Sequence, residues 1–436
     1  MYLGGRQMAV RTAFLFPGQG SQYVGMGNAL FLESAVARQI FEEANDVLGF
    51  DVAKLCFKGD LTELTDTYNA QPAILTVSMA AFRTLMAETP IKPFILAGHS
   101  LGEISALVAS GAIRFQDGLR LVRRRGYLMR EASISAPGSM AAISGMPLEM
   151  IEKKCAEYSN HDQILVLSNI NSPDQIVISG DTRMVTKACE LLTEEGAYAT
   201  LLNVSAAFHS PLMKQASCEF AAELNRIQFS ELKWPVLSNV TALPYRSYHD
   251  IADYLTRQMV STVMWSKSMQ YLKYNQVEAA IEMEPRNVLR NLMKWNEPQI
   301  KTYSYKGVES MDLMEELLNA WKTTEPEATT STHSLVERCL AIAICTRNRN
   351  WSEGEYRLGV VEPYRQVKLM QDKIESENRQ PAYDEMVQAI QMLKSVFVTK
   401  KAPIDEQTER LQQLFRESGT SAMFSTEAIL HKGLFQ

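Results

Sequence analysis

The sequence predicts an α/β protein followed by an all-helical C-terminal extension, and three features of the chain lead to this class. Short apolar runs typical of buried strands, first at 12–16 and then at 94–97, each end in a glycine-rich turn that leads into a helical pattern. Further strand-like runs alternate with helical patterns between 140 and 204. Beyond residue 333 only helical periodicity remains.

Composition excludes several classes of function. The 436 residues are enough for about two to three domains, and the formal net charge of −6 gives no reason to expect a nucleic-acid partner. The cysteines show no C-x-x-C or Cys/His metal spacing, so we expect reduced thiols, no metal site and a cytoplasmic location. No apolar stretch approaches a membrane span, and residues 1–10 lack the apolar centre of a signal peptide, so we expect no membrane partner.

The first α/β unit begins near Arg11, after a loose lead-in. Its strand-like run leads into Pro17-Gly18-Gln19-Gly20-Ser21-Gln22, which is either a plain strand–helix loop or a turn whose N–H groups approach a ligand. Helical patterns follow over 26–37, 42–55 and 73–86. The last of these begins after Gln71-Pro72, where proline is tolerated in a first turn.

The run 94–97 leads into Gly98-His99-Ser100-Leu101-Gly102 and then into a helical pattern over 101–109. A sharp strand-to-helix turn needs glycine on both sides of the serine, because neighbouring Cβ atoms would clash, and it exposes the hydroxyl at a helix N-terminus. G-x-S-x-G also occurs by chance in long chains. Its place between a strand and a helix favours Ser100 as a nucleophile.

The next helical pattern, 115–132, has one unusual charged residue. Arg125 falls on the face that carries Leu121, Val122, Leu128 and Met129, whereas the other arginines of the segment fall on other faces. An unpaired buried guanidinium is costly, so an anionic group must meet it. The helix pattern alone leaves two partners open, a buried Asp or Glu and an acidic substrate, and structural ion pairs are the commoner case.

Between 140 and 204 the order of elements is strand, helix, strand, strand, helix, strand. The expected strands are 140–145, 164–170, 175–180 and 197–204, with helices at 148–158 and 183–195. This order is typical of a ferredoxin-like, or split βαβ, arrangement, and it indicates a small domain inserted into the larger one.

Directly after this segment comes Phe208-His209-Ser210. The other histidines lie beside the serine in sequence or in polar or terminal settings, so His209 is the best general-base candidate, although a polar loop residue remains the alternative. A strand at 236–240, a helix at 250–260 and a strand at 279–283 complete the α/β part by about residue 321.

Residues 322–332 have the composition of a linker. Beyond them, helical patterns cover 333–345, 356–375, 382–397 and 405–416, and none offers a catalytic set of residues. This extension is either a helical appendage packed on the main body or a docking surface for a partner protein, and the appendage is the simpler interpretation.

Taken together, the motifs resemble those of the malonyl-CoA:acyl carrier protein transacylase family of fatty acid and polyketide synthesis. The resemblance spans about 11–320 and rests on Phe16 to Gln22, Gln71-Pro72-Ala73, Gly98 to Glu103, Arg125-Gly126, Asn171-Ser172-Pro173 with Gln175, Phe208-His209-Ser210, and Gln258 ahead of Trp265. It implies an α/β-hydrolase-like catalytic domain at 11–135 and 206–321, the ferredoxin-like insertion at 136–205, the linker at 322–332 and a helical extension at 333–436.

The resemblance implies a role for each motif. Ser100 is expected to be acylated and His209 to be its base, with Gln258 near the histidine and a main-chain carbonyl in place of a triad carboxylate. The N–H groups of Gln19 and Leu101 are expected to form the oxyanion hole.

The same resemblance makes Arg125 the expected clamp for the malonyl carboxylate. Phe208 and Leu101 fit a malonyl-selective pattern, because a ring at 208 crowds an α-methyl group. The implied reaction is ping-pong transfer from malonyl-CoA to the phosphopantetheine thiol of an acyl carrier protein, and no cofactor is implied.

Two further points bear on function. Where the family shows Glu-x-Gly-Pro, this chain has Glu282-Met283-Glu284-Pro285, and Glu284 is expected to strain any positive-φ turn there. The extension resembles that of free-standing acyltransferases serving polyketide synthases in trans. Alternatives are a fatty-acid-pathway malonyltransferase, a proofreading acyl hydrolase on the same fold, a non-catalytic docking protein and an unrelated esterase.

Overall fold

The computed structural model describes residues 10–424, with gaps at 160–162, 205, 308–309, 325–334, 351, 378, 380, 419 and 421–423. The chain divides into two compact units, Met1–Thr324 and Glu325–Gln436. Of the expected linker, residues 322–324 end helix α14 (Glu315–Thr324), and the rest lies outside the described residues. The expected lead-in before Val10, together with His161, His333 and His431, also lies outside them.

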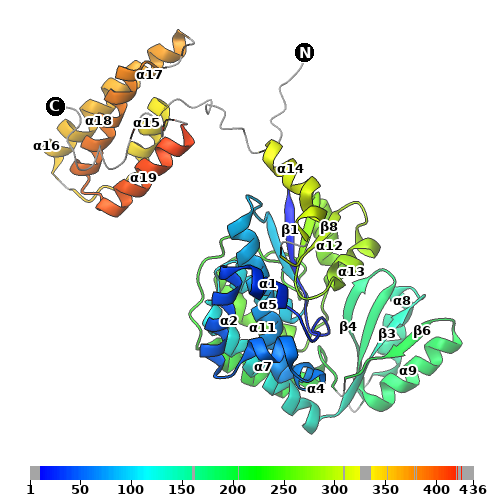
Figure 1. Ribbon diagram of the computed structural model, residues 1–436. Helices are drawn as coiled ribbons and strands as arrows, with labels where there is room; N and C mark the ends of the chain where they lie inside the picture. The colour runs from blue at the N-terminus through cyan, green and yellow to red at the C-terminus, as the bar shows by residue number, and fades with distance from the viewer. Residues whose placement is uncertain are drawn as a thin grey trace, which may run out of the picture. The chain divides into compact units, whose positions relative to one another are not determined.

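A four-stranded parallel sheet forms the centre of the first unit (Figure 1). Its order is β2 (Ile95–Gly98), β1 (Thr12–Phe16), β7 (Ala279–Met283) and β8 (Lys301–Tyr305). Side chains of β1 alternate between two cores, because successive strand residues point to opposite faces. Phe14 and Phe16 join one core, whereas Ala13 and Leu15 join the other.

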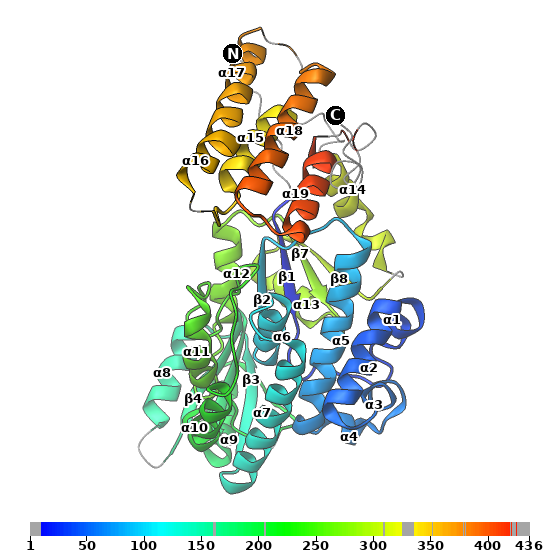
Figure 2. The same cartoon turned by 90° about the vertical axis from the view of Figure 1, so that its left-hand side faces the viewer.

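Helices cover both faces of this sheet, and Figure 2 shows α5, α6 and α7 packed together beside β1 and β2. The first face carries α1 (Asn28–Glu33), α2 (Ala35–Leu48), α3 (Val52–Lys58), α4 (Leu61–Thr65), α5 (Thr67–Glu88), α6 (Leu101–Ala109), α7 (Phe115–Ser135), α10 (Lys214–Leu224) and α11 (Ile251–Gln258). The second face carries α12 (Trp265–Tyr274) and α13 (Val288–Asn296). The active-site candidates therefore come from loops between elements of a buried sheet.

Three expected helix boundaries are wrong, each for a local reason. The pattern 26–37 divides at Ser34, whose side chain accepts from the Ala37 N–H and caps α2. The pattern 42–55 divides at Gly49, which has φ 72°. Pro72 lies inside α5 rather than in its first turn, because Asp66 caps that helix and starts it at Thr67.

The expected strand at 236–240 is also wrong. Val236 makes only an isolated bridge with Leu96, and Leu237 makes another with Pro244. The apolar run is nevertheless buried, since Val236 and Leu237 are fully covered. Strand β8 was not expected, because its sequence, Lys-Thr-Tyr-Ser-Tyr, resembles a polar edge more than a buried strand.

A second, antiparallel sheet lies beside the first within the same unit (Figure 1). Its order is β4 (Leu165–Ser172), β5 (Gln175–Asp181), β3 (Gly138–Ser144) and β6 (Tyr198–Leu201), and α8 (Leu148–Tyr158) and α9 (Thr182–Glu194) share its core. Val263 joins the two parts, because its N–H donates to Ser168 O over 2.9 Å and its carbonyl accepts from Ile170 N over 3.0 Å.

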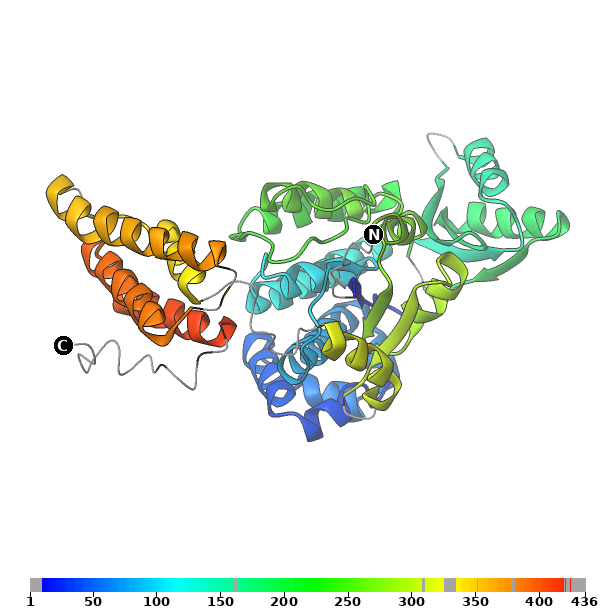
Figure 3. The same cartoon turned by 90° about the horizontal axis from the view of Figure 1, so that it is seen from above.

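The second unit is helical and has its own hydrophobic core (Figure 3). It contains α15 (Leu335–Cys345), α16 (Glu353–Tyr356), the π-helical turn η5 (Arg357–Val361), α17 (Glu362–Ser376), α18 (Tyr383–Thr399) and α19 (Ile404–Glu417). The buried ammonium of Lys400 donates to Ala343 O over 2.7 Å and to Thr346 O over 2.9 Å, which satisfies carbonyls at the end of α15. In the described parts of both units, no helix has the length and apolarity needed to cross a bilayer.

Candidate active site

Ser100 stands in a sharp turn between β2 and α6, with φ 52° and ψ −107°. The flanking glycines are required by space. A Cβ on Gly98 would lie 1.9 Å from the Gly102 carbonyl, and a Cβ on Gly102 would lie 2.0 Å from Phe16 O. Backbone in this region is unfavourable for a non-glycine residue, so its presence indicates a site held by its surroundings. The expected nucleophile elbow is therefore the local structure.

The glycine-rich turn after β1 rests directly on this elbow. The His99 N–H donates to Phe16 O over 3.0 Å, and a Cβ on Gly18 would lie 2.4 Å from His99 O. Gln19 and Leu101 therefore lie on the two backbones that meet beside Ser100. Within the described part of the chain, neither of their backbone N–H groups donates to a protein acceptor. Both remain available to a ligand oxygen.

His209 is 5% exposed and lies against the serine, with Nε2 2.8 Å from Ser100 Oγ. Its Nδ1 lies 2.8 Å from the main-chain carbonyl oxygen of Gln258, an acceptor only, so Nδ1 carries the proton and Nε2 is free to accept one. Burial, and then the nearby charge of Arg125, lower the pKa of His209 to about 3. The imidazole is thus neutral at physiological pH, and its Nε2 presents a lone pair to the serine hydroxyl.

Arg125 points inward from α7 and is 1% exposed. Its Nη2 donates to Ser100 Oγ over 3.2 Å and to Gln258 Oε1 over 3.0 Å, while Nη1 donates to Gln71 Oε1 over 3.0 Å. A Cβ on Gly126 would lie 2.5 Å from Thr67 O, so the glycine after Arg125 lets α7 approach α5 this closely.

The charge of Arg125 is not neutralised by an ion pair with any described carboxylate, and its Nε has no acceptor among the described residues. Burial lowers its pKa to about 10 and the charge of Glu103 opposes this shift, so the guanidinium is still charged at neutral pH. The commoner explanation of a buried arginine, a structural ion pair, is therefore absent from this part of the chain. A buried cation beside a nucleophile is suited to a substrate that carries its own negative charge.

Sequence reasoning missed three residues that hold these groups. Asn239 Oδ1 accepts from the Ser100 N–H over 2.7 Å, and its Nδ2 donates to Gly98 O over 2.7 Å, so one amide holds the elbow on both sides. Gln71 and Glu103 were noted only as parts of motifs. The available signal was polarity at positions expected to be buried, since all three are 0–1% exposed.

The site opens into a cavity of about 440 Å³ between the two sheets. Lining residues include Gln19, Ser100, Arg125, Phe208, His209, Asn171, Gln175, Leu202 and Val288. His99 also lines it but turns to the second sheet, where its Nε2 lies 2.8 Å from Asn171 Oδ1. The cavity therefore brings together every expected site residue except Leu101 and Gln258, which lie behind Ser100 and His209.

Residues 13–308 match the family model described as acyl transferase domain. The chain belongs to the acyl transferase family. A malonyl CoA-acyl carrier protein transacylase of Bacillus subtilis is 38% identical over 407 residues, which cover 92% of this chain and 99% of the relative. A second enzyme of that name, from Bacillus subtilis strain 168, is 41% identical over 304 residues, 70% of this chain and 96% of its own length.

A solved malonyl-transacylase, in complex with its type II polyketide synthase acyl carrier protein, superposes with a TM-score of 0.68 at 36% identity. The match covers 72% of this chain and 99% of that one. The second Bacillus relative and this structure thus match the acyl transferase unit almost over their full lengths. The first relative also matches most of the helical extension.

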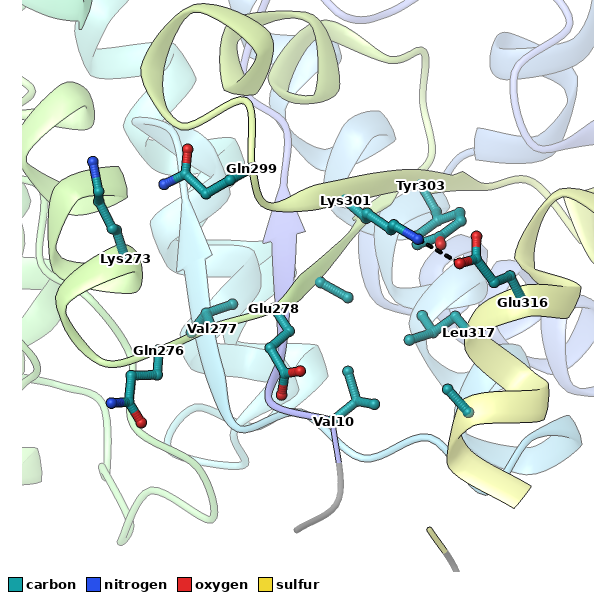
Figure 4. Close-up of a pocket in the computed structure, with 12 residues that line it drawn as sticks. Val10, Lys273, Gln276, Val277, Glu278, Gln299, Lys301, Tyr303, Glu316 and Leu317 are labelled. Atoms are coloured by element: carbon teal, nitrogen blue, oxygen red, sulfur yellow. Dashed lines mark hydrogen bonds and ion pairs between the residues drawn. The ribbon is translucent and has the colours of Figure 1, made fainter. Parts of the chain in front are cut away.

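This acyl transferase has a second cavity, of about 510 Å³, far from the serine (Figure 4). This second cavity lies where β1, β7 and β8 begin, whereas Ser100 follows the carboxyl end of β2. Because the strands are parallel, the cavity and Ser100 lie at opposite edges of the sheet. Figure 4 shows the ion pair of Lys301 with Glu316 at its rim. None of its described lining residues is Ser, Cys or His, so it offers no comparable nucleophile.

The condition for strain at Glu284, a positive φ at that residue, is not met. The positive φ in this loop, 63°, belongs to Arg286. The Glu284 carboxylate is 5% exposed and accepts from Tyr23 Oη over 2.9 Å and from the Gly27 N–H over 3.2 Å, while its carbonyl accepts from Ser78 Oγ over 2.8 Å. In this acyl transferase the glutamate joins neighbouring loops instead of distorting its own.

Proposed function

We propose that the protein transfers a malonyl group from malonyl-CoA to the phosphopantetheine thiol of an acyl carrier protein, through a malonyl ester on Ser100. One observation carries the proposal: the buried guanidinium of Arg125, which forms no ion pair with a described carboxylate, lies 3.2 Å from Ser100 Oγ, which itself lies 2.8 Å from His209 Nε2. The names of the two Bacillus relatives and of the solved complex agree with this activity.

In the first half-reaction His209 Nε2 takes the proton of Ser100 as the oxygen attacks the thioester carbonyl. The N–H groups of Gln19 and Leu101 stabilise the resulting oxyanion, a contribution of about 3 to 4 kcal/mol per donor. The C–S bond then breaks, and coenzyme A leaves as a thiol with the proton from His209. Arg125 holds the far carboxylate of the malonyl group in two charge-assisted hydrogen bonds.

The second half-reaction reverses these steps with another thiol. His209 accepts the proton of the phosphopantetheine thiol, sulfur attacks the acyl-serine, and Ser100 leaves with the proton. The main-chain carbonyl of Gln258 stabilises the imidazolium formed in both halves, 2.8 Å from Nδ1.

We further propose that the enzyme serves a polyketide synthase in trans and acts in the cytoplasm. The helical extension supports this, since the relative with 92% coverage of this chain must share most of it, whereas the other relative matches only 304 residues, 70% of this chain. A fatty-acid role is the second candidate, because the catalytic unit alone matches enzymes named only for malonyl transfer. Comparing kcat/KM for carrier proteins of the two pathways tests this.

We also infer that the first unit is an α/β-hydrolase-like domain, residues 11–135 and 206–321, with a ferredoxin-like insertion at 136–205. The parallel order β2-β1-β7-β8 and the antiparallel order β4-β5-β3-β6 support this division. The extension at 333–436 completes this division, and of the expected linker at 322–332 the first three residues belong to α14.

The activity is tested by intact-protein mass spectrometry after mixing the full chain with malonyl-CoA. We expect a malonyl adduct on the native protein and none on Ser100→Ala. Adding holo acyl carrier protein removes the adduct and yields malonyl-carrier protein. Release of free malonate without transfer supports the hydrolase alternative, and the absence of any adduct overturns the proposal.

A further inference from the structure

Glu103 is a fully buried acid that the proposed mechanism does not use. It lies in the first turn of α6, three residues after the nucleophile, and is 0% exposed. Its Oε2 accepts from the Asn239 N–H over 3.1 Å and from Gln258 Nε2 over 2.7 Å, and its Oε1 accepts from the hydroxyl of Tyr245. It touches neither the cavity nor His209.

Gln258 connects this acid to the reacting groups. Its side-chain Oε1 accepts from Arg125 Nη2 over 3.0 Å, its Nε2 donates to Ser100 O over 3.0 Å, and its main-chain carbonyl lies 2.8 Å from His209 Nδ1. An amide group can turn either its oxygen or its nitrogen toward Arg125. Only the oxygen is useful there, because a guanidinium donates and does not accept.

Glu103 fixes this choice. The Oε2 of Glu103 accepts from the Asn239 N–H and from the Nε2 of Gln258. Because the nitrogen of the Gln258 amide faces Glu103, the oxygen of that amide faces Arg125. Without Glu103, Nε2 retains Ser100 O and the more distant Asn239 Oδ1 at 3.5 Å. The amide then has less to prevent its rotation away from Arg125.

We propose that Glu103 is a positioning residue for acyl selection, which acts through the side chain of Gln258 to aim the Arg125 guanidinium at the carboxylate of the acyl group. The inference rests on the proposed malonyl transfer. It assigns to the Glu of the elbow helix a role in choosing the acyl group, distinct from anchoring the loop that contains Asn239.

The hydrogen bond from Gln258 to Glu103 does not depend on the charge of Glu103. Burial raises its pKa to about 7, so the acid and the carboxylate both occur near neutral pH. Because Oε2 faces two N–H donors, the proton of the neutral acid belongs on Oε1, toward Tyr245. Both forms therefore accept from Gln258, and Glu103→Gln retains that acceptor as well.

The test compares acyl-serine formation from malonyl-CoA and from acetyl-CoA, which has no far carboxylate. Glu103→Met preserves side-chain length without a strong acceptor, and we expect its kcat/KM for malonyl-CoA to fall about tenfold, mainly through KM, because one hydrogen bond to a charged network is lost. Its kcat/KM for acetyl-CoA changes by less than about twofold, and Glu103→Gln keeps both values within about twofold of the native enzyme.

Tyr245→Phe is the matched control, since it removes a partner of Glu103 without touching Gln258. We expect it to leave the malonyl-to-acetyl ratio unchanged. In an Arg125→Ala background, Glu103→Met should not change the ratio further, because the two act on one contact. Equal losses for both substrates in Glu103→Met, or a changed ratio in Glu103→Gln, overturn the proposal.

Two outcomes remain distinct. Thermal unfolding checks that Glu103→Met is folded, and a shift of the Glu103→Gln ratio toward acetyl contradicts the proposed acceptor role independently of that variant. If the native protein forms no malonyl-serine, the proposed function fails. If the native protein forms that adduct but Glu103→Met leaves the malonyl-to-acetyl ratio unchanged, only this inference fails.

Discussion

The Nη2 of Arg125 donates to the Oγ of Ser100 across 3.2 Å, so a buried cation contacts the nucleophile directly. The contact has two consequences. It leaves a positive charge that an acyl group with a carboxylate can neutralise, and it lowers the pKa of the neighbouring His209 further below its usual value, burial being the larger cause.

Replacing Arg125 by Ala should remove the preference for malonyl. We expect kcat/KM for malonyl-CoA to fall about 100- to 1,000-fold, because a buried carboxylate loses its only charged partner. Acetyl transfer should persist or rise. The half-buried Arg124, whose side chain pairs with Glu219 and Glu223, provides the control, and Arg124→Ala should change neither rate. Parallel losses for both acyl groups would contradict the clamp.

The pH profile should reveal the unusual histidine. With the pKa of His209 at about 3, the single-turnover acylation rate should stay level from pH 8 down to about pH 5, since the base remains unprotonated. An ordinary histidine would lose half its activity at its reference pKa of 6.5. In Arg125→Ala, assayed with acetyl-CoA, the acid limb should move to higher pH. A native limb near 6.5 would refute this account.

The elbow should not tolerate a methyl group. Gly102→Ala places a Cβ 2.0 Å from Phe16 O, so we expect a loss of about 2 to 4 kcal/mol in the free energy of unfolding. Gly354→Ala makes the same chemical change where no atom lies within 4 Å and should be nearly neutral. Denaturant unfolding measures both. Equal stability of the two variants would show that the elbow relaxes.

Phe208 should limit the size of the acyl group. It is half-buried and lines the cavity beside His209, so Phe208→Ala opens space for an α-methyl group. We expect the kcat/KM ratio of malonyl-CoA to methylmalonyl-CoA to fall about 10-fold, the value of one methyl contact. Competition between the two thioesters, read by mass spectrometry, checks this. An unchanged ratio would place selectivity elsewhere.

Glu284 should stabilise the loop that contains it. Glu284→Gly removes the acceptor for the Tyr23 hydroxyl and the Gly27 N–H, so unfolding should become easier by about 1 to 3 kcal/mol. Glu284→Gln keeps one acceptor oxygen and should lose less. If glycine at this position stabilised the protein, the expectation of strain would be right after all.

The sequence predicted elements well where periodicity and flanking residues agreed. The helix 148–158 and the strand 279–283 have the expected bounds. Errors arose where tertiary contacts overrode local pattern. Pro72 lies within α5 because the cap at Asp66 begins the helix earlier, and 236–240 is buried without pairing as a strand, because sheet pairing is not visible in a single segment.

The candidate site was predictable in its residues but not in their connections. Ser100, Arg125 and His209 were named from motifs. The structure brings both Arg125 and His209 within hydrogen-bond distance of Ser100, although the catalytic roles of all three remain predictions. The contacts of Glu103 and Asn239 were not foreseeable. Residues 136 positions apart meet only through the fold, and neither had a local pattern that pointed to the other.

At Gly18, Gly98 and Gly102 the molecule leaves no room for even one carbon, so main chain packs against main chain beneath the serine. A residue with a Cβ does not fit at any of these three positions unless the backbone moves. A change of acyl donor therefore calls for substitutions among the side chains that line the cavity, such as Phe208 and Leu202, and leaves the three glycines in place.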